Sequence, residues 1–233
     1  SYSDRRTGKN QKTANHSPVR TREARAGQAG RGRIQMRSAR DITTAIVQVG
    51  LVPLFKEHGY RKTGCHFARR HGTVGHYLNI QLSQWNQGAN GHFFVNAGVM
   101  FDDFKRLRGT EPPALPKYGD CDFMVRLDAI DSTFPRWVDI DDSTNVEEKA
   151  AWLHEHIEKS FVVPLDAVSS TQAFAKTGWV NAIPWDFPAV FQYLLGEIEE
   201  SRRLVGVQAE RFADRGCTFE ALAESLHLRF KPA

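Results

Sequence analysis

The sequence predicts an α+β fold: an antiparallel sheet of about four strands, an N-terminal helix against it and a helical C-terminal half. Apolar residues recur at helical spacing before residue 60 and again after residue 144. Between these positions they alternate with polar residues, which is the period of a strand. Short segments rich in turn-forming residues separate the alternating stretches, and short connections favour antiparallel neighbours.

The N-terminal helix is expected to begin at Asp41, a residue type that caps helix N-termini, and to end at Gly59. Pro53 falls inside this run. Because proline interrupts helical hydrogen bonding, it should kink the helix or begin a second short one. The apolar stripe of this segment consists of Ile42, Ala45, Ile46, Val49, Val52 and Phe55.

Four segments are expected to form strands: 65–71, 76–84, 92–101 and 121–127. The residues Gly-Thr-Val-Gly at 72–75 are typical of a hairpin turn, and the loop 86–91 is rich in turn formers. The segment 102–120 contains three prolines and is expected to be a long connection. Its start, 102–107, should form a helical turn.

The second half is expected to be helical. Thr144 and Glu147 have the spacing of a capping box, and an apolar stripe follows that closes near Pro164. A short helix is expected to begin after Ser169 or Ser170.

A long helix is then expected, capped by Asp186, with Pro188 tolerated in its first turn and Leu204 still on its buried side. Gly216 and Thr218 separate it from a last helix at 219–228.

Residues 1–37 are expected to be a disordered basic arm, followed by a single domain at 38–233. Residues 1–40 contain eleven Lys or Arg and two Asp or Glu, whereas the rest of the chain contains twenty basic and twenty-five acidic residues. The arm has too few large apolar residues to offset the entropy of ordering it. Met36 is the first methionine, so a natural start there is a serious alternative.

The three cysteines are widely spaced and form neither a disulfide framework nor a zinc pattern, which favours a reducing compartment. No apolar run is long enough to span a membrane. We therefore expect a cytoplasmic protein.

Several segments carry markers that are specific as a set. The segment 51–60 reads as a helix running into a Gly-aromatic step, and 61–69 reads as a basic turn and a first strand. The later markers are 78–83, 94–99 and Arg126-Leu127 followed by Trp137. Together these segments resemble a bacterial family of unknown function, the DUF4304 type. The resemblance covers roughly residues 45–165 and implies a fold class and a bacterial origin, but no activity.

The polar side of the expected sheet is the candidate binding face. Alternation places five polar residues opposite the core: Asn79, Gln81, Ser83, Asn96 and Arg126. Side-chain amides recognise a peptide, base or sugar edge through paired hydrogen bonds. Gly98 on the same side would leave room for a ligand, and Phe94 and Met100 would add apolar contact. The alternative is an ordinary solvated sheet face.

The sequence gives weaker support for other kinds of site. Asp102 and Asp103 stand at a strand end and, with the basic arm, suggest a nucleic-acid-associated protein or a metal-dependent nuclease. The acidic cluster at 139–142 also suggests a metal-dependent nuclease, but the segment 139–143 looks more like a solvated turn. The histidines between residues 58 and 92 are dispersed by strand alternation, since His66 and His71 fall on opposite faces. No catalytic residue, metal site or cofactor is nominated.

We therefore favour a non-enzymatic binding module, while an enzyme stays open. A protein partner is preferred over nucleic acid, and no membrane association is expected. A toxin-neutralising or defence role is suggested only by analogy with other small bacterial domains.

Overall fold

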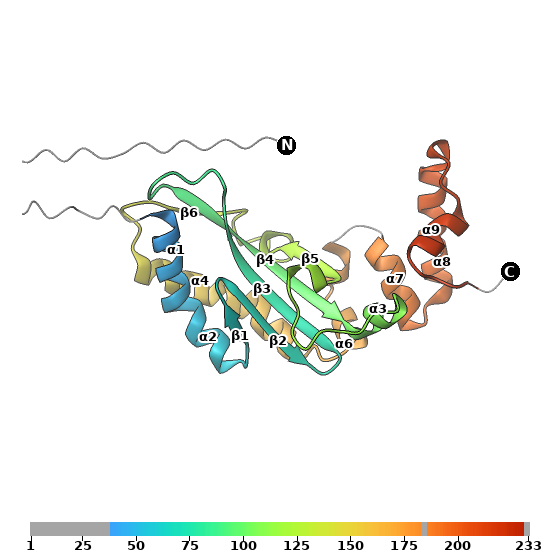
Figure 1. Cartoon of the computed structure of the whole chain (residues 1–233), viewed down its shortest axis with the longest axis horizontal. Helices are drawn as coiled ribbons and strands as arrows, with labels where there is room; N and C mark the ends of the chain where they lie inside the picture. The colour runs from blue at the N-terminus through green and yellow to red at the C-terminus, as the bar shows by residue number, and fades with distance from the viewer. Residues whose placement is uncertain (1–37, 183–185, 231–233) are drawn as a thin grey trace, which may run out of the picture. The chain divides into compact units, whose positions relative to one another are not determined.

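One antiparallel sheet organises the described structure. The computed structural model describes residues 38–182 and 186–230. Within these residues the strands are β1 (Arg61–Thr63), β2 (His66–His71), β3 (Val74–Leu82), β4 (Gly91–Phe101), β5 (Phe123–Arg126) and β6 (Val138–Ile140). Their order is β1-β2-β3-β4-β5, and β6 pairs with β4 on the same side as β5 (Figure 1). The predicted α+β class is confirmed.

The described helices are α1 (Ala39–Ile46), α2 (Val52–Glu57), α3 (Asp102–Leu107), α4 (Val146–Ile157), α5 (Val163–Asp166), α6 (Thr171–Ala175), α7 (Asp186–Leu195), α8 (Ile198–Arg211) and α9 (Phe219–Ser225). These residues lie in one compact unit that runs from Met36 to Ala233. None of the helices within the described ranges combines the length and the apolar character needed to span a bilayer.

The four predicted strands correspond to β2, β3, β4 and β5, and the predicted helical turn corresponds to α3. The prediction missed β1 and β6. Each has only three residues, too few to display alternation. The interpretation of 139–143 as a solvated turn is corrected in its first part: Asp139 and Ile140 lie in β6, and the exposed turn begins at Asp141.

The first helix begins three residues earlier than predicted. Ser38, not Asp41, is its N-cap: the Ser38 hydroxyl accepts the Asp41 N–H at 3.2 Å, and the Asp41 carboxylate accepts the Ser38 N–H at 3.0 Å. This is a capping box with Asp41 as its third helical residue. Gly59 follows the C-cap with φ +75°, as its predicted role requires.

Both sheet-covering helices contain a π-helical stretch, Val47–Leu51 between α1 and α2 and Glu158–Val162 between α4 and α5. Pro53 lies two residues after the first stretch, and Pro164 lies two residues after the second. Proline lacks an N–H, and its ring collides with the carbonyl four residues earlier. The wider π turn moves that carbonyl away, so each proline starts a new helical segment without a sharp bend.

The two helices touch at Gly50. A Cβ added there would stand 2.5 Å from the Ala150 carbonyl oxygen, so only glycine permits this approach. The Gly50 carbonyl also bonds to His154 Nδ1 at 3.0 Å. The predicted capping box at the start of α4 is wrong: Asn145 is the N-cap and accepts the Glu148 N–H, whereas Thr144 bonds to Asp141.

The C-terminal helices begin largely where predicted. Ser170 caps α6 and Thr218 caps α9. The single long helix from Asp186 is corrected to two, α7 and α8, because Gly196 adopts φ +87° and ends the first. They pack against each other, and the buried Ser201 hydroxyl donates to the Ala189 carbonyl at 2.7 Å.

Phenylalanine dominates the core where the helices meet the sheet. Phe55 of α2 stacks on Phe67 of β2, with ring centroids 4.2 Å apart. Phe101 of β4 lies 5.0 Å from Phe174 of α6 and 6.0 Å from Phe191 of α7. The helices therefore bury one sheet face and one sheet end.

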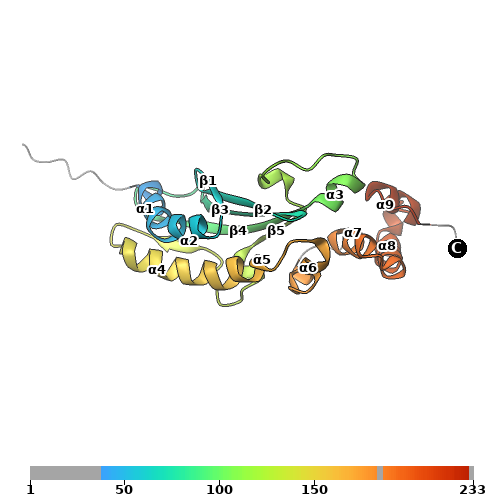
Figure 2. The same cartoon turned by 90° about the horizontal axis from the view of Figure 1, so that it is seen from below.

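The opposite face carries no α-helix among the described residues, only the connection before β5 with its short 3-10 turn, Tyr118–Asp120. Figure 2 shows α4 and α5 on one side of the sheet and the connection before β5 on the other. Phe67 stacks on Phe55 of α2, so Phe67 points to the helix side, and so do Leu78 and Ala97, which are aligned with it across β3 and β4. Their strand neighbours must point to the helix-free side.

A candidate binding face on the helix-free side of the sheet

An amide cluster lies at the centre of the helix-free face. Asn79 of β3, Asn96 of β4 and Arg126 of β5 are direct cross-strand partners. Asn96 Nδ2 donates to Asn79 Oδ1 at 2.9 Å and to Gln81 Oε1 at 3.0 Å. The structure thus brings together four of the five side chains that the sequence nominated.

The two central amides are less exposed than a solvated face implies. Asn79 is 7% exposed and Asn96 is 8% exposed, whereas Gln81 is exposed and Arg126 is half-buried. Neighbouring side chains on the same face shield them. Alanine at Asn79 or Asn96 is therefore expected to cost more stability than alanine at exposed Gln81.

Free hydrogen-bonding groups remain on the cluster. The Asn96 side-chain nitrogen donates to both neighbours, and Asn79 and Gln81 each accept through their side-chain oxygen. The other end of each amide has no hydrogen-bond partner among the described residues, and none of them belongs to the buried unpartnered atoms. These ends therefore reach solvent and can bond to a ligand.

Aromatic and cationic groups extend the face beside the amides. The Arg126 guanidinium lies 4.7 Å from the centre of the Phe94 ring, within cation–π distance. The His92 ring is 5.3 Å from Phe94 and 5.6 Å from Trp137, which is 42% exposed. This row offers flat apolar contact surface next to the amide groups.

The remaining nominated features have local roles. Ser83 lies just past β3, and its hydroxyl accepts the Trp85 N–H at 3.2 Å, so it shapes the turn. Gly98 does not leave room for a ligand: a Cβ there would be 2.7 Å from Met124 and 2.9 Å from the Cys121 sulfur. Its space is filled by the chain itself. Met100 is fully buried.

The connection between α3 and β5 covers one part of this face. Pro116 lies on Gly75, where an added Cβ would be 2.9 Å from the proline ring. Between Pro116, Tyr118 and the strands β1 to β3 is a hollow of about 410 Å³. Tyr77 lies in it, and its hydroxyl is hydrogen-bonded to His66 Nδ1. Burial raises the pKa of Tyr77 to about 12, so this phenol keeps its proton at neutral pH.

The carboxylates of Asp102 and Asp103 already have hydrogen-bond and ion-pair partners within the protein. Arg70 Nη2 contacts both Asp102 carboxylate oxygens at 2.7 Å, and Asp102 is 6% exposed. Asp103 accepts the Thr171 hydroxyl at 2.7 Å and pairs with Arg106 at 3.4 Å. The pair joins α3 to the sheet and to α6, which is a structural role.

The histidines are dispersed, as the alternation predicted. His66 is paired with Asn79 on the helix-free side, whereas His71 and His76 lie on the helix side with ring centres 6.0 Å apart. Within the described ranges no three His, Cys, Asp or Glu side chains form a group that could hold a metal ion.

His76 is the centre of a buried polar network that the sequence did not reveal. Its Nε2 is 3.0 Å from the Val168 carbonyl oxygen, and its Nδ1 accepts Arg69 Nε–H at 3.0 Å. Arg69 also binds Asp166 at 2.6 Å and stacks on Tyr60. Burial, then the Arg69 charge, lower the pKa of His76 from 6.5 to about 3. The neutral imidazole therefore connects the sheet to the segment after α5.

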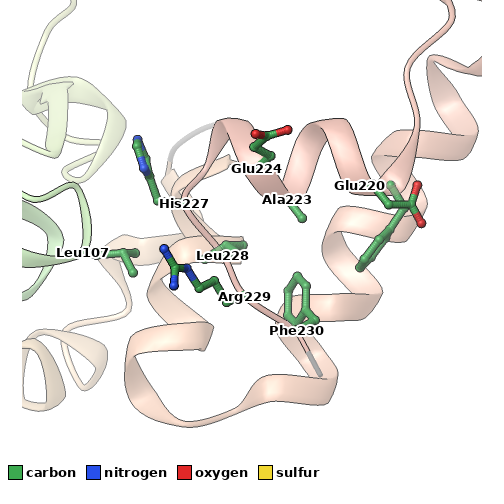
Figure 3. A pocket seen from close by; sticks show the side chains of 9 residues that line it. Leu107, Glu220, Ala223, Glu224, His227, Leu228, Arg229 and Phe230 are labelled. Atoms are coloured by element: carbon green, nitrogen blue, oxygen red, sulfur yellow. The ribbon is translucent and has the colours of Figure 1, made fainter. Parts of the chain in front are cut away.

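A second hollow, of about 660 Å³, lies between the end of α3 and the C-terminal segment. Figure 3 shows Leu107 at one end of it and Glu220 at the other. Its lining mixes two acidic side chains with His227 and Arg229, so it favours no ligand charge. We therefore do not choose it as the candidate site.

Sequence reasoning missed the residues that the connection supplies. Leu115, Pro116 and Tyr118 line the smaller hollow, but connections have no period that shows which side chains point inward. The three prolines were the available signal, because they stiffen the segment. The basic arm at 1–37 lies outside the described residues.

Comparison with known proteins supports the resemblance. The model of DUF4304, described as a domain of unknown function, matches residues 51–185, which is more than half of the chain. The range includes all six described strands and every residue of the candidate face. No curated protein and no solved structure matched the chain. The chain therefore belongs to the DUF4304 family of domains of unknown function.

Proposed function

We propose that this chain is a non-enzymatic binding module of the bacterial cytoplasm, whose helix-free sheet face holds a segment of a partner protein. The observation that carries the proposal is the amide cluster of Asn79, Gln81 and Asn96. It combines low exposure of the central amides with hydrogen-bonding ends that have no partner among the described residues.

A peptide fits this chemistry. Each free amide end offers either N–H donors or a carbonyl acceptor, and a peptide backbone offers the complementary groups at regular spacing. The neighbouring row of Phe94, His92 and Trp137 supplies apolar contact, as aromatic residues do at protein interfaces. A face that served only for solubility would not need buried amides.

Nucleic acid is less well supported. Beyond residue 40 the chain has five more acidic than basic residues, which opposes phosphate binding. The nuclease alternative needs Asp102 and Asp103 free to bind a metal ion, yet both have basic or hydroxyl partners. The free state of Cys65, Cys121 and Cys217 is consistent with a reducing cytoplasm. Toxin neutralisation or another defence role stays our expectation for the biological setting.

The test begins with co-purification of the full chain from its source cells, followed by titration calorimetry with the recovered partner. A Gln81→Ala/Arg126→Ala variant should bind at least tenfold more weakly, a loss of about 1.4 kcal/mol. Neither side chain is buried, so folding should be preserved.

A Lys56→Ala/Glu57→Ala variant is the control, because these exposed residues lie on α2 away from the face. It should bind like the wild type. Equal binding by both variants contradicts the proposal, as does a recovered partner that nuclease treatment removes.

A further inference from the structure

The hollow beneath the connection before β5 has the features of a small-molecule site. Its floor comes from β1, β2 and β3, and its wall comes from residues 115–118. Its volume of about 410 Å³ lies within the range of known ligand pockets. It adjoins the amide cluster without including it: the lining contains His66, the cross-strand partner of Asn79, but neither Asn79, Gln81 nor Asn96.

The wall of the hollow is held in place. Pro116 is buried against Gly75, where no side chain would fit. Cys121, a few residues later, packs on Gly98 in the same manner. Tyr118 meets Tyr77 edge to face, with ring centres 6.5 Å apart. Because the connection contacts the sheet at two glycines, the hollow is preformed and little entropy is lost when it is filled.

The walls are mainly apolar and the rim is cationic. Ala68, Leu115 and Pro116 and the two tyrosine rings supply the apolar surface. Arg61 and Lys117 are exposed at the edge, and neither has an ion-pair partner among the described residues. No aspartate or glutamate lines the hollow. Its charge therefore complements an anion.

From this geometry we infer that the hollow binds a small aromatic carboxylate, with the ring between Pro116 and the two tyrosines and the carboxylate at Arg61 and Lys117. Tyrosine edges and faces favour an aromatic ring over an alkyl chain. The guanidinium and ammonium groups favour a carboxylate through charge-assisted hydrogen bonds. This inference does not depend on the proposed protein partner, since none of the side chains that it uses belongs to the amide cluster.

The experiment is calorimetric titration of the full chain with 2-naphthoate, with neutral 2-naphthamide and with octanoate. We expect 2-naphthoate to saturate the protein in the millimolar range or below, and each of the other two to bind at least tenfold more weakly. An Arg61→Ala/Lys117→Ala variant should lose the preference for 2-naphthoate over 2-naphthamide. Arg136→Ala, an exposed arginine outside the hollow, should keep it.

A filling variant locates the site. Ala68 faces the hollow from β2, so Ala68→Leu should occupy the space and abolish 2-naphthoate binding while the melting temperature stays close to that of the wild type. The inference is overturned if 2-naphthoate does not bind, if 2-naphthamide or octanoate binds equally well, or if folded Ala68→Leu binds like the wild type.

Discussion

Buried His76 should make the protein acid-sensitive well above the range in which carboxylates titrate. Its side chain is 0% exposed, and both ring nitrogens are engaged, one with the Val168 carbonyl and one with Arg69 Nε–H. Protonation would place a second N–H against Arg69 and a charge in a buried site. The pKa of His76 is lowered from 6.5 to about 3 for these reasons.

The sign of the effect follows from proton linkage. Between pH 6.5 and about 3 the unfolded chain binds a proton at this histidine and the folded protein does not. Acid therefore favours unfolding, by about 1.4 kcal/mol for each pH unit below 6.5. At pH 4.5 the loss from this residue is about 2.7 kcal/mol, a large part of the stability of a typical domain.

The assay is urea unfolding, followed by tryptophan fluorescence at pH 7.5, 5.5 and 4.5 and constant ionic strength. Wild type should lose about 2.7 kcal/mol more than His76→Gln between pH 7.5 and 4.5, even if the variant is less stable throughout. The same substitution at half-buried His92 controls for the loss of an imidazole as such. Equal pH dependence in wild type and His76→Gln would refute the linkage.

Three further predictions concern stability. Urea unfolding should show that Asn96→Ala costs about 1–2 kcal/mol while Gln81→Ala stays within about 0.5 kcal/mol, and equal costs would contradict the amide geometry. Gly50→Ala should lower the free energy of unfolding by about 1–3 kcal/mol. Gly206→Ala should raise it by about 0.5–1 kcal/mol, because nothing lies within 4 Å of an added Cβ there. The reverse order would refute the close approach at Gly50. A chain that begins at Met36 should melt within about 4 °C of the full chain, and a larger drop would show that residues 1–35 stabilise the domain.

Local periodicity predicted the main strands, because alternation along one strand can be seen without knowing which strands pair with it. Alternation along β3 and β4 is sufficient to place Asn79, Gln81 and Asn96 on one side. Their burial could not be predicted in the same way, because it depends on neighbours brought in by pairing. The separation of Ser83 from the cluster has a related cause: β3 ends one residue earlier, at Leu82.

Helix caps were less predictable than helices. Ser38 and Asp41 both belong to residue types that cap, as do Thr144 and Asn145, and residue type alone does not choose between near neighbours. At α4 the Thr144 hydroxyl already accepts the Asp141 N–H, and Asn145 accepts the Glu148 N–H instead. Similarly, Gly196 breaks the predicted long helix because its φ of +87° allows α8 to turn back onto α7.

No described α-helix covers the helix-free face, because the later helices pack on another surface. Phe101 and Phe123 stand at one end of the sheet's helix side, and α6 and α7 pack their own phenylalanines there. On the other side of the sheet, the connection before β5 packs on Gly75 and Gly98, so this connection and not an α-helix fills the space above them. The DUF4304 match ends at residue 185, before α7. The amide cluster and the hollow beneath the connection thus both lie in the part of the chain that the family model matches, so the predictions for this face apply to the family domain and not to the helices added after it.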